Sequence, residues 1–325
     1  MGLVQSMTRS LKSVKNPKVR DIVWSGIGWL QTFREFAVDA SDYLRDSAYR
    51  PERSRTIAHR ERDLMFSYHQ VEKGLTFPRT KRPFGAKAAS SITQGVSSTD
   101  FSRMKPAVMN GAVHAHEALV TWNSVGTYDD RVAPRAEFRP TLVSHADDVS
   151  EFFSTRWSCR DYDMDRRISV EDIRSVVRLA QAAPSVCNRQ SARIQILEDL
   201  SLKAKALALQ NGNRGFGDSI PHLAVVTVDR RYFKDAGERN QRWVDGGLFA
   251  MTFVWALHAR GYASCMLNWS LGVTATKALR RELGLSPHED VICLIAFGHA
   301  AAGARAARSE RIALDEILTI RGPAL

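Results

Sequence analysis

Long apolar runs are missing from the 325-residue chain. No stretch of apolar residues reaches the length that a helix needs to cross a bilayer, so a membrane-spanning protein is not expected. The first residues carry basic side chains but lack the apolar segment of a secretory signal. The prediction is therefore a soluble, cytoplasmic protein.

Cysteine is scarce and scattered. The four cysteines, Cys159, Cys187, Cys265 and Cys293, form no Cys-x-x-Cys pair and have no histidine nearby at the spacing of metal ligands. A disulfide framework and a zinc site are not expected, and no metal site is predicted. The scarcity fits a reducing cytoplasm, and small buried side chains are the interpretation favoured for Cys159, Cys187 and Cys265.

Acidic residues are outnumbered by basic ones. The 46 Lys and Arg residues against 35 Asp and Glu residues give a formal net charge of +11. This balance indicates an anionic partner, which could be nucleic acid, a membrane surface or a phosphorylated cofactor. No helix-turn-helix, zinc-finger or aromatic RNA-binding signature is present, so a nucleic acid partner is not expected.

Residues 1–147 are predicted to form a mostly helical, basic N-terminal extension of unknown role. Apolar residues recur on one helical face from Asp21 to Leu44. Such a face usually packs on its own protein; the basic residues before it make weak contact with an anionic membrane surface the alternative. A further helix is expected from Ala107 to Trp122, whereas Pro78 to Ser98 is rich in Pro, Gly, Ser and basic residues and is predicted as loop.

His69 and Glu72 would share one face of a helix that Gly74 is predicted to end. The pair could transfer protons or bind a metal. Ordering a helix end is the commoner role for such a pair, and no third ligand is evident in the sequence.

A polar connection from Thr127 to about Asp148 is predicted as the linker to a second domain, residues 148–325. In this domain, Ser169 is a good helix N-cap, with Asp172 after it. Apolar patterns predict strands at 193–197, 223–228, 264–267 and 291–297, and helices at 202–210, 244–260 and 276–283. The helix at 244–260 is apolar nearly all round, which is typical of a core or a subunit interface.

Arg156, Ser158 and Arg160 stand at alternate positions, so an extended backbone would point all three side chains to one side. Guanidinium groups bind phosphate oxygens bidentately, and serine can donate a further hydrogen bond. A phosphate site is one interpretation; a solvated basic turn before a helix is the other.

Taken in order, four motifs resemble the nitroreductase family of FMN-dependent oxidoreductases over about residues 150–325. The motifs are Arg156-x-Ser158-x-Arg160; Ala183-Pro184-Ser185 followed by Asn188-x-Gln190; Gly261 followed by Ser264 to Leu267; and Gly298 with the later Arg311. The resemblance implies an α+β domain in which helices flank a central mixed β-sheet and long helices form a homodimer interface that holds FMN.

The resemblance also implies which residues bind FMN. Arg156, Ser158, Arg160 and Arg311 would bind the phosphate and the ribityl chain. The ring edge would be lined from the partner subunit by Pro184, Ser185, Asn188 and Gln190. Leu267 and Asn268 would set backbone groups against the flavin nitrogens. No catalytic side chain is implied, because the flavin carries the hydride chemistry.

The implied activity is hydride transfer from NADH or NADPH, through FMN, to a small electron-poor acceptor such as a nitro compound, a quinone or an enone. Alternatives are a flavin-dependent dehalogenase, a flavin-fragmenting enzyme, or a flavin-holding protein that docks on a membrane or another protein. The chain departs from the family after Gln190, where Ser191 and Ala192 replace the usual Pro-Trp. Trp269 could cover the flavin or pack in the core.

Overall fold

The structure is a computed structural model that describes residues 16–46, 54–77, 79–134, 146–307 and 311–322. Across these ranges, no helix combines the length and the apolar character needed to cross a membrane. The basic residues before Asn16 and half of the predicted linker (Thr127 to Asp148) lie outside the described residues. Contact of the basic N-terminus with a membrane therefore stays a prediction.

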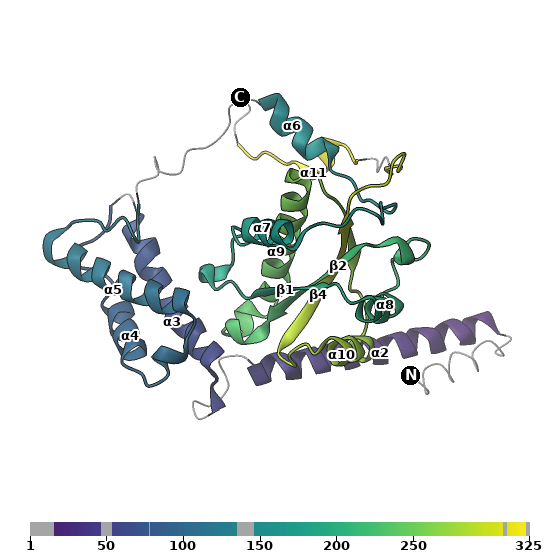
Figure 1. Cartoon of the computed structure of the whole chain (residues 1–325). Coiled ribbons are helices and arrows are strands. Elements are labelled where there is room, and N and C mark those ends of the chain that lie inside the picture. The colour runs from purple at the N-terminus through teal and green to yellow at the C-terminus, as the bar shows by residue number, and fades with distance from the viewer. Residues whose placement is uncertain (1–15, 47–53, 78, 135–145, 308–310, 323–325) are drawn as a thin grey trace.

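A four-stranded sheet lies at the centre of the C-terminal half (Figure 1). Its order is β1 (Ala192–Leu197), β2 (His222–Asp229), β4 (Glu289–Gly298) and β3 (Ala263–Asn268), and each neighbouring pair is antiparallel. Beside β3, the isolated bridge between Ser158 and Ser264 is parallel. The predicted α+β class is confirmed. The four described strands form an antiparallel sheet where a mixed one was expected, since the parallel bridge is isolated and lies outside the named strands.

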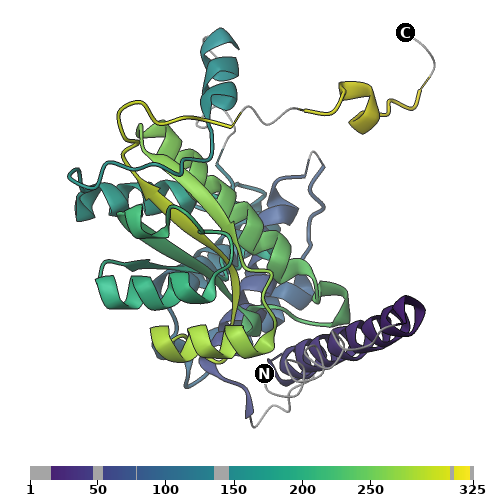
Figure 2. The same ribbon diagram turned by 90° about the vertical axis from the view of Figure 1, so that its right-hand side faces the viewer.

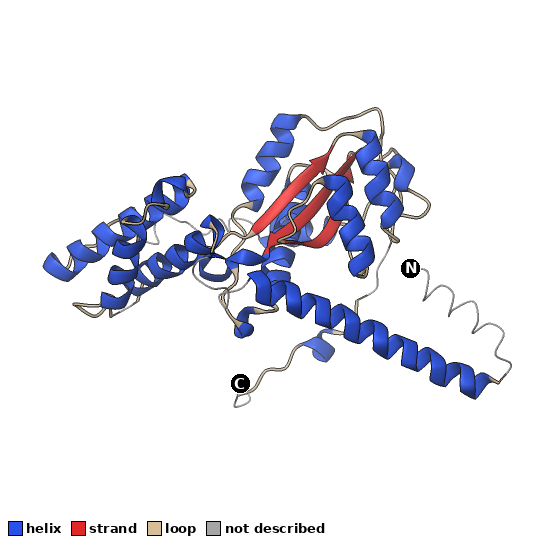
Figure 3. Ribbon diagram, turned by 90° about the horizontal axis from the view of Figure 1, so that it is seen from below, coloured by secondary structure: helices blue, strands red, loops and turns tan. Residues whose placement is uncertain are grey.

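Helices cover both faces of the sheet (Figure 3). One face packs against α7 (Val170–Ala180) and α9 (Gln241–Ala259), and the other against α8 (Leu200–Leu209) and α10 (Val273–Leu283). Strand β2 is buried on both faces, as its continuous apolar run predicts. The shorter helices of this half are α6 (Ala146–Thr155), α11 (Leu314–Ile317), η4 (Val186–Asn188), η5 (Gly217–Ser219), η6 (Arg230–Tyr232) and η7 (Ala236–Glu238).

Gly246 lets α9 lie close to the sheet. A Cβ atom at this position would stand 2.5 Å from the Ile292 side chain and 2.9 Å from that of Val228. Since real Cβ atoms do not approach so closely, a larger residue would push the helix away from the strands.

The N-terminal half contains a separate helical bundle of α3 (Ile57–Leu75), α4 (Ala86–Val96) and α5 (Pro106–Val125), seen beside the sheet domain in Figure 1. The prediction of a loop from Pro78 to Ser98 was wrong, because α4 buries Ala88 and Ile92 in the bundle core. The short η2 (Phe101–Arg103) joins α4 to α5.

Gly74 does not end the helix that contains it. Helix α3 continues to Leu75, with Thr76 as its C-cap. A Cβ atom at Gly74 would come within 2.3 Å of the Phe84 ring, so this glycine makes room for an aromatic side chain. The glycine marks close packing near the helix end.

Helix α2 (Pro17–Asp46) lies against the sheet domain, near α10 (Figures 1 and 3). Glu35 on α2 accepts a hydrogen bond of 2.7 Å from the backbone N–H of Val273, and Asp39 accepts one of 2.6 Å from Arg242. Several of its apolar side chains remain exposed, so the expected packing of its apolar face on its own protein is partial. The exposed ones include Ile22, Trp29, Leu30, Phe33 and Phe36.

The end of α2 is joined to the sheet domain by a buried ion network around Arg230. The guanidinium of Arg230 is fully buried and contacts Asp46 on α2 at 3.0 Å and Asp290 on β4 at 2.5 Å. The Asp46 carboxylate also lies 2.8 Å from Nδ1 of His288. Buried charges are tolerated only when paired, so these contacts fix the end of α2 to β4.

Replacing Arg230 with glutamine should therefore lower the free energy of unfolding by about 3–5 kcal/mol, because Asp46 and Asp290 would stay buried without their shared cation. Urea denaturation measures the change. The matched control is Arg174→Gln, which removes an exposed arginine from α7 and should change stability by less than about 0.5 kcal/mol. Equal stability of the two variants would contradict this account of the network.

Candidate functional site

The stretch from Arg156 to Arg160 runs beside the edge strand β3. The backbone N–H of Cys159 donates a hydrogen bond of 2.9 Å to the carbonyl of Ser264. Cys159 is fully buried in the core between the sheet and helices α8 and α10, and Trp157 packs against this core. The alternation predicted for an extended backbone therefore directs Arg156, Ser158 and Arg160 away from that core.

Arg156 and Arg160 lie close enough to Cys265 on β3 to affect its titration. Burial raises the pKa of the Cys265 thiol, and the positive charges of Arg160 and Arg156 oppose that rise. Neither guanidinium has a carboxylate partner among the described side chains. Arg160 donates one hydrogen bond of 3.3 Å, to the carbonyl of Ser158. Two cations without counter-ions at one strand edge favour an anionic ligand.

Arg311 is exposed on the segment 311–322, which Figure 2 shows leading away from the sheet. We considered five cavities in the described part of a single chain, and none of them is lined by Arg311, Arg156 or Arg160. The convergence of Arg311 with the other two arginines stays a prediction.

The strained loop, residues 184–190, follows α7 and carries the residues predicted to line the ring edge of FMN. Cys187, Asn188 and Gln190 have φ angles of 48°, 50° and 48°, in the left-handed region that side chains other than glycine rarely adopt. Backbone held in this way often lies at binding sites, where the surrounding structure supports the strain. The side chains of Pro184, Asn188 and Gln190 are exposed, and that of Ser185 is half-buried.

Two buried side chains hold this loop in place. Asp245 on α9 accepts hydrogen bonds from the backbone N–H of Val186 at 3.2 Å and from the amide of Gln241 at 2.8 Å. Burial raises the pKa of the Asp245 carboxyl, and these hydrogen bonds oppose the rise. Arg189 donates to the carbonyl of Val186 at 3.1 Å and pairs with Glu238 at 2.5 Å.

Leu267 and Asn268 end strand β3, the edge strand of the sheet. Leu267 is buried in register with Leu294 of β4, whereas Asn268 is exposed. The carbonyl of Asn268 accepts a hydrogen bond of 3.0 Å from Gln210. The structure thus places both residues on the strand next to the Arg156–Arg160 stretch.

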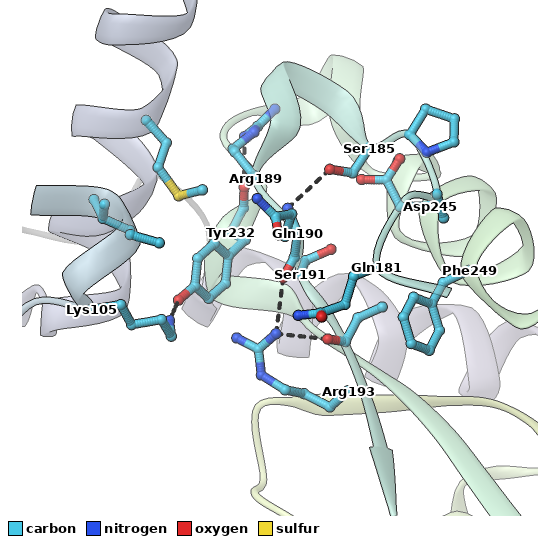
Figure 4. Close-up of a pocket in the computed structure, with 16 residues that line it drawn as sticks. Lys105, Gln181, Ser185, Arg189, Gln190, Ser191, Arg193, Tyr232, Asp245 and Phe249 are labelled. Carbon is cyan, nitrogen blue, oxygen red and sulfur yellow. Dashed lines mark hydrogen bonds between the residues drawn. The ribbon is translucent and has the colours of Figure 1, made fainter. Parts of the chain in front are cut away.

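A cavity of about 270 Å³ lies between the strained loop and the helical bundle (Figure 4). The sheet domain contributes Pro184, Ser185 and Gln190, three of the predicted residues, to its lining. The lining also includes Met65, Lys105 and Val108 from the bundle, and Arg189, Ser191, Ala192, Arg193, Tyr232, Asp245 and Phe249 from the sheet domain.

The bundle side of the cavity is organised around Glu61. Its carboxylate accepts hydrogen bonds from Nζ of Lys105 at 2.6 Å and from the hydroxyl of Tyr232, which also accepts one from Lys105. Burial works to raise the pKa of Glu61, but the hydrogen bonds from Lys105 and Tyr232 outweigh it and hold the pKa below its ordinary value. Tyr232 follows β2 yet packs in the bundle core, so it joins the two halves at the cavity.

The sequence also singled out His69, Glu72 and Trp269. On α3, Nδ1 of His69 lies 3.2 Å from Oε2 of Glu72. No group of three or more His, Cys, Asp and Glu side chains suited to a metal occurs in the described parts of the chain. The indole N–H of Trp269 donates a hydrogen bond of 3.0 Å to Thr276, and its ring packs against the core cluster under α10.

Sequence reasoning missed Lys105, Arg193, Tyr232 and Asp245. Lys105 lies in an unremarkable stretch before α5, and Tyr232 follows a strand, so neither position carries a local signal. The available signal was the Ser191-Ala192 pair that replaces Pro-Trp, because it predicts a changed shape next to Gln190. Arg193 follows that pair directly.

Comparison with known proteins gives a consistent result for the sheet domain. The family model described as the nitroreductase family matches residues 153–211 and 197–299. No match to a curated protein was found. Among solved structures, ydfN from Bacillus subtilis is 18% identical, with a TM-score of 0.48, and the match covers 55% of this chain and 100% of that one.

Two further structures give similar values. A nitroreductase family protein from Streptococcus pneumoniae is 20% identical, with a TM-score of 0.46, over 53% of this chain and 100% of the other. An FMN-dependent nitroreductase from Clostridium difficile is also 20% identical, with a TM-score of 0.43, over 49% of this chain and 92% of the other.

The role assigned to Asp245 can be tested with Asp245→Asn. The amide keeps the size of the side chain but offers one acceptor in place of two. The free energy of unfolding should fall by about 1–3 kcal/mol, and the Val186 amide should exchange its hydrogen faster. Urea denaturation and hydrogen exchange measure the two effects.

The control for this variant is Asp218→Asn, at an exposed position of η5, which should leave both quantities unchanged. Unaltered exchange at Val186 in the Asp245 variant would show that this carboxylate does not hold the loop.

Proposed function

Because the nitroreductase family model matches residues 153–299, we propose that the protein is an FMN-dependent oxidoreductase. It passes a hydride from NADH or NADPH, through FMN, to a small electron-poor acceptor such as a nitro compound, a quinone or an enone. The observation that carries the proposal is the pair of arginines, Arg156 and Arg160, that lie beside β3 without carboxylate partners in the described chain.

The residues present fit a flavin monophosphate. Arg156, Ser158 and Arg160 would hold the phosphate, where guanidinium groups and a hydroxyl supply charge-assisted hydrogen bonds. Arg311 would reach the same phosphate from the C-terminal segment. Leu267 and Asn268 lie on the adjoining strand, where their backbone groups would orient the ring. When bound, FMN supplies the hydride chemistry.

We propose that the site is completed by a second copy of the chain. Pro184, Ser185, Asn188 and Gln190 lie on a loop that projects its polar side chains outward, and they would line the ring edge of the partner's site. The exposed apolar side chains of α9 support a homodimer built on this helix. They include Trp243 at 43%, Val244 at 51% and Leu248 at 41% exposure.

Purified protein should be yellow, and it should oxidise NADH or NADPH when a quinone is present. A colourless preparation that takes up no added FMN would overturn the proposal. A yellow preparation that is inert toward both nicotinamide nucleotides would instead favour a flavin-holding protein with little turnover.

The phosphate site is tested by Arg156→Ala. Loss of a charge-assisted hydrogen bond should weaken FMN binding about ten- to hundredfold, measured by quenching of flavin fluorescence. Riboflavin lacks the phosphate, so the wild type should prefer FMN to riboflavin and the variant should lose much of that preference.

Arg174→Ala serves as the matched control, because it removes an exposed arginine of α7 that is not part of the motif and should leave FMN affinity unchanged. Equal FMN affinity in wild type and the Arg156 variant would mean that the phosphate binds elsewhere.

A further inference from the structure

The cavity beside the strained loop has small side chains in part of its wall. Ser191 and Ala192, which directly follow Gln190, both line it. The rings of Tyr232 and Phe249 form part of the wall (Figure 4). At about 270 Å³, the cavity is smaller than the pockets of roughly 300–1,000 Å³ that hold drug-sized ligands. It therefore suits a small molecule.

Ser191 supplies a polar group that nothing in the described chain satisfies. Its side chain is fully buried, it lines the cavity, and its hydroxyl has no hydrogen-bond partner there. A buried polar group left unpaired destabilises a protein by about 1–3 kcal/mol, and such groups are rare. A ligand in the cavity could satisfy this hydroxyl.

Arg193 supplies a positive charge next to Ser191. Its Nη1 atom donates hydrogen bonds to the carbonyls of Gln190 at 2.9 Å and Ala192 at 2.7 Å, which fix the guanidinium at the cavity wall. The guanidinium carbon lies 5.5 Å from the centre of the Tyr232 ring. Its Nε and Nη2 atoms have no acceptor within the described chain, so they are available to a ligand.

The other charged groups of the cavity have partners already. Lys105 is paired with Glu61 and Arg189 with Glu238. Asp245 accepts hydrogen bonds from the N–H of Val186 and from Gln241. Arg193 is thus the lining cation whose charge no described carboxylate neutralises, and it favours an anionic ligand.

We propose that this cavity is the subsite for the carboxylate of a small aromatic acid. Arg193 binds the carboxylate through its free N–H groups, Ser191 donates one more hydrogen bond, and Tyr232 and Phe249 contact the ring. The helical bundle takes part because Lys105 and Glu61 hold the Tyr232 hydroxyl. This inference rests on the proposed function, because an acid that carries a reducible group would be the hydride acceptor of that reaction.

Binding can be measured without turnover. Isothermal titration of the FMN-treated protein compares 4-nitrobenzoate with 4-nitrobenzamide, which has the same shape and no charge. The wild type should bind the acid more tightly than the amide. In Arg193→Gln, affinity for the acid should fall about ten- to hundredfold while affinity for the amide changes little.

Three further variants sharpen the test. Arg193→Lys keeps the charge without the planar fork and should retain part of the preference for the acid. Ser191→Ala should reduce acid binding to a smaller extent. Arg174→Gln, which removes the same charge outside the cavity, should match the wild type. Thermal unfolding of each variant checks that the fold is intact.

The outcomes separate this inference from the proposed function. If the protein takes up FMN but Arg193→Gln and Arg193→Lys both keep the wild-type preference for the acid, the subsite is wrong and the function stands. If no FMN is taken up and the acid still binds through Arg193, the subsite stands and the function is wrong. Loss of NADPH binding, in place of acid binding, in Arg193→Gln would overturn the carboxylate assignment.

Discussion

The buried guanidinium of Arg230 has carboxylate partners on two elements that are far apart in the sequence, Asp46 at the end of α2 and Asp290 on β4. A charge can be buried only where opposite charges and hydrogen bonds compensate its lost hydration. Arg230 and Asp290 pair within the sheet domain, whereas Asp46 meets Arg230 only when α2 lies against that domain. Tyr232, two residues later, reaches the opposite way into the bundle core. The short segment after β2 therefore fixes both parts of the N-terminal half, and with them one wall of the cavity.

This arrangement gives the N-terminal half a physical connection to the candidate site. The family model matches from residue 153 onward. Lys105 and Val108 precede this match, yet they line the same cavity as Pro184 and Gln190. Glu61 orders Lys105 and Tyr232, and Tyr232 stacks beneath Arg193. A chain of contacts thus runs from α3 to the strand that carries the proposed anion-binding residues. The bundle therefore forms one wall of the cavity.

Sequence reasoning was most accurate where periodicity and burial agree. The apolar run of β2, the long α9 and the Ser169 cap were all predictable, because local pattern and tertiary packing favour the same structure. It failed at α4, whose small and polar residues resemble a loop until Ala88 and Ile92 are seen in the bundle core. It also could not find Lys105, Tyr232 or Asp245, since their roles arise from contacts across the fold. The motif residues themselves were recognisable, whereas their convergence on one site across two chains stays a prediction.

We propose that one FMN site combines the Arg156–Arg160 stretch of one chain with the 184–190 loop of another. Co-expression of an Arg156→Ala chain with an Asn188→Ala chain, each deficient alone, tests this most directly. Random pairing makes half of the dimers mixed, and each mixed dimer regains one complete site, so FMN binding should recover to roughly a quarter of the wild-type capacity. Mixed preparations that bind no more FMN than the single variants would contradict a shared site.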